Sequence, residues 1–121
     1  MTRARAEHGQ STVELALLLP MLVFGLLALV QTALVVRDAV GVVHASREAA
    51  RVAAVEPDPR RAIDAAHRVL GDAIVTVSPR PAVGAPIAVE VEYRSSTQLP
   101  LVGPLFPDPV LRSRTEMRVE R

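Results

Sequence analysis

The sequence contains no cysteine, tryptophan, lysine or asparagine, and aromatic residues make up 2% of it. Without cysteine, disulfides, thiolate metal sites and cysteine nucleophiles are excluded. Without asparagine, N-glycosylation is excluded. The charges are interspersed and sum to +1, and stacking aromatic side chains are nearly absent, so nothing indicates a nucleic-acid partner.

The residue types that usually carry catalysis are scattered along the chain. His8, His44 and His67 show no metal-ligand spacing, and Glu90 and Glu92 share the solvated face of a predicted strand. The sequence has no phosphate-binding loop, nucleophile elbow or zinc motif. We therefore expect no enzyme activity, no metal or other cofactor, and no small-molecule substrate.

What the sequence does contain is a long apolar segment without charge, the 22 residues from Leu15 to Val36. A helix of this length is about 33 Å long, enough to cross a hydrocarbon core of about 30 Å. The segment is longer than the apolar region of about 7–15 residues in a cleaved secretory signal. We predict a transmembrane helix that stays in the mature protein, in preference to the buried helix of a soluble protein.

Pro20 and Gly25 interrupt this apolar segment. Proline removes a backbone donor and tends to kink a helix, and such breaks persist in membranes where neighbouring groups satisfy the freed backbone. Two interpretations stay open: kinks that are merely tolerated, or a bend or local melting that helps subunits pack in a filament. Basic residues flank both ends of the segment, so the positive-inside rule gives no orientation.

A short polar leader ends at Gly9, and Glu14 stands just before the apolar segment. This pattern resembles the processing site of Flp-type prepilins. The resemblance implies that a prepilin peptidase cuts between Gly9 and Gln10, that the leader of residues 1–9 is lost in the cytoplasm, and that the C-terminal part lies outside. It also implies that Glu14 pairs with the new amino group of a neighbouring subunit and sets the helix register. The alternative is a hydrated carboxylate among lipid headgroups, because a charge at the edge of hydrocarbon needs a partner or water.

A wider resemblance, to the TadE-like members of the TadE/TadG family of pilus-assembly proteins, rests on three stretches: residues 9–16, residues 45–53 with the sequence ASREAARVA, and residues 118–120. It implies a minor pilin or pseudopilin with other pilin-like subunits and Tad assembly proteins as partners. Leu15 departs from the pattern, because Flp-type sites often have an aromatic residue after the glutamate.

Residues 37–56 should extend the transmembrane helix, which we place at residues 10–36. Small and apolar residues there, among them Ala50 and residues 52–54, would let another helix approach closely. Arg47, Glu48 and Arg51 form a charged cluster in which Glu48 and Arg51 can pair at i, i+3. This cluster is either a solvated helix face or a set of contacts to neighbouring subunits.

The stretch Pro57-Asp58-Pro59 should end the long helix and cap a second one, which runs to Gly71 with an apolar stripe of Ile63, Ala66 and Leu70. Alternation predicts strands at 74–77, 87–94 and, more weakly, 112–119. Residues 57–121 should therefore form a small extracytoplasmic domain. The expected fold is α+β and pilin-like, with a long and a short helix on a three-stranded antiparallel sheet.

The connection between the last two predicted strands, residues 97–109, contains four prolines and an apolar patch from Leu99 to Phe106. A loop this long and apolar is unusual unless it packs against or binds something. The leading hypothesis for the whole chain is a minor pilin-like subunit of a Flp/Tad pilus or tight-adherence apparatus, in the cell membrane or in a pilus. The alternative is an unprocessed signal-anchored protein whose outer domain binds a secretion or envelope partner.

Overall fold

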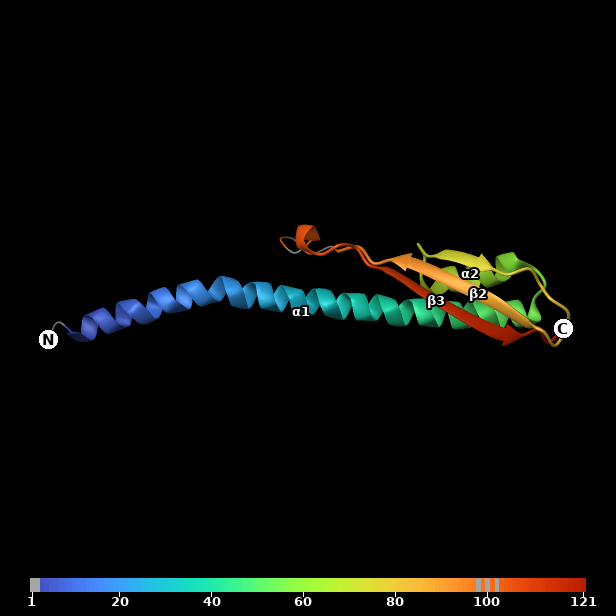
Figure 1. Cartoon of the computed structure of the whole chain (residues 1–121), viewed down its shortest axis with the longest axis horizontal. Helices are drawn as coiled ribbons and strands as arrows, with labels where there is room; N and C mark the ends of the chain where they lie inside the picture. The colour runs from blue at the N-terminus through green and yellow to red at the C-terminus, as the bar shows by residue number, and fades with distance from the viewer. Residues whose placement is uncertain (1–2, 98, 100, 102) are drawn as a thin grey trace. The chain divides into compact units, whose positions relative to one another are not determined.

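The computed structural model describes residues 3–97, 99, 101 and 103–121. The described residues form two compact units, one within 3–33 and 97–107 and one of residues 34–96 with 108–121. The elements, labelled in Figure 1, are α1 (Arg3–Val55), α2 (Pro59–Val69), β1 (Ile74–Val77), β2 (Pro86–Arg94), the 3-10 turn η1 (Gly103–Leu105) and β3 (Val110–Arg118). The predicted α+β fold, with a long helix, a short helix and a three-stranded antiparallel sheet, is confirmed.

The sheet has the order β1-β2-β3, with both strand pairs antiparallel. The predicted alternation of β2 is confirmed, because Ile87, Val89 and Val91 are buried against the helices. The residues between them are half-buried rather than exposed, since β2 is the central strand and has a neighbour on each side. The third strand begins two residues before the predicted start because Val110 pairs with Arg94.

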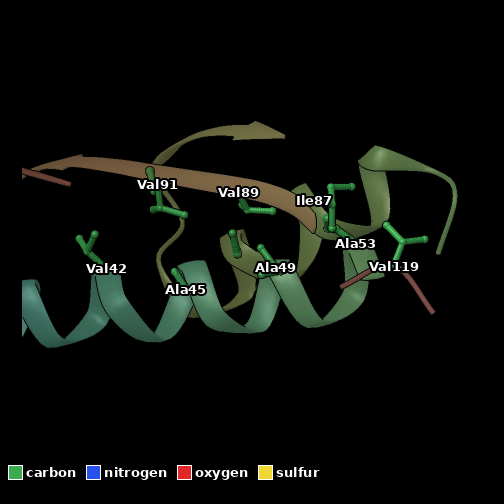
Figure 2. Close-up of a cluster of buried hydrophobic side chains, with 12 residues drawn as sticks. Val42, Ala45, Ala49, Ala53, Ile87, Val89, Val91 and Val119 are labelled. Carbon is green, nitrogen blue, oxygen red and sulfur yellow. The ribbon is translucent and has the colours of Figure 1, made fainter. Parts of the chain in front are cut away.

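The core of the second unit lies between α1 and the inner face of β2 (Figure 2). Ala45, Ala49 and Ala53 repeat every four residues on α1, so they share one helix face, and they are at most 2% exposed. Methyl side chains allow the helix backbone to lie close to the sheet. The sequence predicted that Ala50 and residues 52–54 admit a neighbouring helix, and in the structure Ala50 and Ala53 share one core with α2 as well as with β2.

The second helix begins as predicted and packs differently from the prediction. The Asp58 side chain caps it by accepting a hydrogen bond of 3.0 Å from the backbone N–H of Arg60, and Pro59 occupies the first turn. Its fully buried face is Ala62, Ala65 and Ala66. Of the predicted stripe, Ala66 is buried and Leu70 packs against the core, whereas Ile63 is half-buried.

Candidate functional site

The N-terminal part of α1 is the first functional feature of the described chain. A stretch of this helix has a mean hydropathy of 2.5, and none of it is buried inside the protein. Most of its leucines are more than half exposed, for example Leu17 at 74% and Leu29 at 70%. A helix that exposes this many large apolar side chains is suited to lipid and not to water. By length and composition, this segment can cross a membrane.

The predicted processing site lies at the start of this helix. Gly9 and Gln10 both have helical backbone, and the side chain of Gln10 lies outside the described part of the structure, as do residues 1–2 of the predicted leader. Glu14 is exposed, four residues further along the same helix. The arrangement leaves the carboxylate available to a partner outside the chain, and its role in register stays a prediction.

The helix backbone continues through Pro20 and Gly25 without a break in the described residues. A side chain built at Gly25 would meet nothing within 4 Å, so the structure gives no packing reason for glycine there. Local melting at these residues in a filament stays a prediction. A bend at these residues that serves subunit packing also stays a prediction.

The charged cluster lies on the part of α1 that belongs to the second unit. Arg51 donates two hydrogen bonds to the Glu48 carboxylate, of 2.8 and 3.2 Å, so the predicted i, i+3 pair is confirmed. The hydrogen bond from Arg51 lowers the pKa of Glu48 below its ordinary value of 4.5. Arg47 is exposed beside the pair. Contact of this cluster with neighbouring subunits stays a prediction.

Sequence reasoning missed the side chain that closes the end of α1. The guanidinium of Arg80 donates to the carbonyl oxygens of Ala53 at 2.7 Å and Glu56 at 2.8 Å, and also to the carbonyl of Arg121. The last carbonyls of a helix lack partners within the helix, and the end of the helix attracts positive charge. Pro57 has no N–H to offer the Ala53 carbonyl, so Arg80 takes the place of the absent donor.

Two further side-chain contacts hold α1 to the sheet, and both were missed. The fully buried hydroxyl of Ser46 lies 2.9 Å from the Ser113 hydroxyl and 2.8 Å from the Thr115 hydroxyl, both on β3. Ser95, which follows β2, donates a hydrogen bond of 2.7 Å to the Asp38 carboxylate. These contacts fix the height and rotation of α1 on the sheet.

Nothing in the described residues resembles a catalytic centre. No group of three or more His, Asp or Glu side chains there could hold a metal ion. His67 instead places a ring nitrogen 3.0 Å from the Ala73 carbonyl oxygen, which joins α2 to the start of β1. An open hollow of about 340 Å³ lies next to Arg51, with Met117 and Glu120 in its lining, and it brings no set of reactive groups together.

One apolar helix that can cross a membrane, followed by a small α+β unit, fits the class of single-pass membrane proteins. A family model described as "TadE-like protein" matches residues 9–51, so the chain is TadE-like over this segment and the predicted resemblance is confirmed there. Comparison with curated proteins and with solved structures gave no match. The family match and the apolar helix together fit a membrane protein associated with a Tad pilus.

Proposed function

We propose that this chain is a minor pilin-like subunit of a Flp/Tad-type pilus or tight-adherence apparatus, processed by a prepilin peptidase after Gly9. The observation that carries the proposal is the TadE-like match, because it begins at residue 9 and runs along α1 to residue 51. It covers the proposed new N-terminus, the acidic residue before the apolar segment and the charged cluster. We expect no enzyme activity, and the chain's part in chemistry is that of a peptidase substrate.

The proposed mechanism is assembly through the apolar helix. In the membrane, α1 offers exposed apolar side chains to lipid, and in a filament the same side chains would meet the helices of other subunits. Glu14 would then be an acidic group among apolar surfaces, where a charge is costly unless it is paired. The new amino group of Gln10 on a neighbouring subunit is the partner that we propose. This ion pair forms in one register of the neighbouring helices, and any other register leaves the Glu14 carboxylate unpaired among apolar surfaces.

Processing is tested by replacing the residue before the cut. We expect Gly9→Ala to block the loss of a leader of about 1 kDa, since nine of the 121 residues of a 13.0 kDa chain would be removed. The measurement is intact mass of the membrane-extracted protein after co-expression with a prepilin peptidase. Gly25→Ala is the matched control, because a methyl group there meets open space. A wild-type chain that keeps Met1 in the presence of active peptidase would favour the signal-anchored alternative.

The role of the carboxylate is tested by Glu14→Gln, which removes the charge and keeps the shape. We expect unchanged membrane insertion and a fall in the amount of protein recovered in sheared pili, since an amide cannot form the ion pair. Glu120→Gln is the control, because Glu120 is an exposed acidic residue outside the apolar segment. Equal recovery of Glu14→Gln and the wild type in pili would remove the proposed pairing.

A further inference from the structure

The connection between β2 and β3 contains a second apolar element that the pilin-like function does not use. Residues 97–107 carry no charge. Three large apolar side chains in this stretch are exposed: Leu101 at 67%, Leu105 at 70% and Phe106 at 47%. Exposed apolar groups gathered on one short segment mark a contact with a protein or a membrane.

This loop belongs to the same compact unit as the apolar part of α1. The side chain of Gln31 is 5% exposed, and its Nε2 donates a hydrogen bond of 3.3 Å to Oγ1 of Thr97. Gln31 is one of the few polar residues within the apolar segment, and its Oε1 is buried without a hydrogen-bond partner among the described residues. This hydrogen bond therefore places the start of the loop next to Gln31 of α1, at the level of that residue along the helix.

That level is close to one boundary of a bilayer. Gln31 follows Glu14 by 17 residues, which corresponds to about 25 Å along a helix. With Glu14 at one edge of a hydrocarbon core of about 30 Å, Gln31 lies a few ångströms inside the other edge. The loop therefore starts a few ångströms inside this edge, next to Gln31.

The backbone of the loop also suits the interface. Unpaired backbone donors are costly in hydrocarbon, and proline residues carry no N–H. Four of the residues between 97 and 109 are proline. The N–H of Gly103 bonds to the Leu99 carbonyl at 3.1 Å, next to the turn η1. The prolines and the Gly103 bond therefore reduce the number of N–H groups that need water.

We propose that residues 97–107 enter the outer lipid interface beside α1, with Leu101, Leu105 and Phe106 among the upper acyl chains. The loop would be a second membrane contact that limits tilt and rotation of α1. The absence of charge and the shared unit with the apolar helix favour lipid as the occupant over a second protein. This inference rests on α1 crossing the membrane, as the proposed function does.

The test uses the natural absence of cysteine, since a single cysteine can be labelled in an otherwise unchanged chain. The variants are Leu101→Cys and Leu105→Cys in the loop, with Val83→Cys as the matched control and Leu22→Cys as the marker of the helix. Their native side chains are similarly exposed, at 67%, 70%, 67% and 65%. Each carries an environment-sensitive fluorophore, and the full chain is reconstituted in phosphatidylcholine–phosphatidylglycerol vesicles that contain spin-labelled lipid with the nitroxide high or low on the acyl chain. Fluorescence of the lone tyrosine, Tyr93, verifies that each variant is folded.

We expect the high nitroxide to quench both loop labels at least roughly twofold more than the Val83→Cys label, as for groups held about 5–10 Å into the interface. The Leu22→Cys label should be quenched most by the low nitroxide. If the Leu22→Cys label is quenched but the loop labels are quenched no more than the Val83→Cys label, the loop contact is overturned and the helix still lies in the membrane. A shift of loop-label emission to shorter wavelength without lipid quenching also overturns it, because a protein then covers the loop. Absence of quenching at Leu22→Cys refutes the membrane helix, and the proposed function with it.

Discussion

Arg80 gives the sharpest test of how the end of α1 is held. Its two short hydrogen bonds, to the carbonyls of Ala53 and Glu56, join the segment before β2 to a helix end 24 to 27 residues earlier in the chain. In Arg80→Ala the Ala53 carbonyl loses its donor. Ala53 is 2% exposed, and Pro57 cannot replace the donor, so the carbonyl stays unsatisfied.

The cost follows from these contacts. A buried acceptor left without a partner destabilises by about 1–3 kcal/mol, and the Glu56 carbonyl, which is at the surface, can bond to water instead. We therefore expect Arg80→Ala to lower the free energy of unfolding by about 2 kcal/mol. For a unit the size of residues 34–96 with 108–121, this corresponds to a fall in Tm of roughly 8–16 °C.

The assay is thermal unfolding of the full chain in detergent, followed by the fluorescence of Tyr93, which is the one tyrosine in the sequence and packs against the core. Arg80→Lys should recover part of the loss, because an ammonium is also positive but lacks the fork that reaches several carbonyls. Arg118→Ala, at an exposed arginine on β3, should leave Tm nearly unchanged. A wild-type Tm for Arg80→Ala would refute the capping argument.

Two further predictions concern α1. Ser46→Ala should lower the free energy of unfolding by about 1 kcal/mol in the same assay, because two hydroxyls on β3 lose a buried partner; the exposed Ser96→Ala is the control, and an equal effect of both would contradict the reasoning. Arg51 lowers the pKa of Glu48, so the stabilisation from this pair is present above the ordinary value of 4.5 and disappears as the pH falls through the lowered value. Glu48→Gln should remove that part of the acid dependence of Tm, and identical Tm curves against pH for both proteins would rule it out.

The parts of the fold that the sequence predicts are those set by local patterns. The uncharged length of residues 15–36 predicts a helix that can cross a membrane, and the alternation in β2 predicts which side chains are buried. Pro57 and Pro59 mark the end of α1 because proline cannot donate the backbone bonds that a helix needs. Each of these signals comes from neighbours within a few residues, where spacing alone determines which side chains share a face.

The contacts that escaped prediction join residues far apart in the chain. Ser46 meets its partners on β3 across 67 and 69 residues, and Arg80 bonds to backbone carbonyls, which have no sequence signature. The alanines of α1 predicted a close neighbour but could not specify it, since a small side chain admits a helix and a strand equally. In the structure the alanines of α1 share one core with Val89 and Val91 of β2 and with two alanines of α2. The proposed processing site differs from these contacts within the chain, because its partner would be another molecule.

The two parts of α1 differ in how their side chains are covered. From Asp38 onward, the helix satisfies its buried polar groups within the chain, through Ser95, through the hydroxyls of β3 and through Arg80. Before Ala33, most large side chains are apolar and exposed, and the chain offers them little cover beyond the loop that starts at Thr97. The TadE-like match extends over both parts and stops before α2. The match therefore follows the helix and not the sheet: one part of it packs on the sheet, and the other exposes apolar side chains that the proposed function assigns to lipid or to neighbouring subunits.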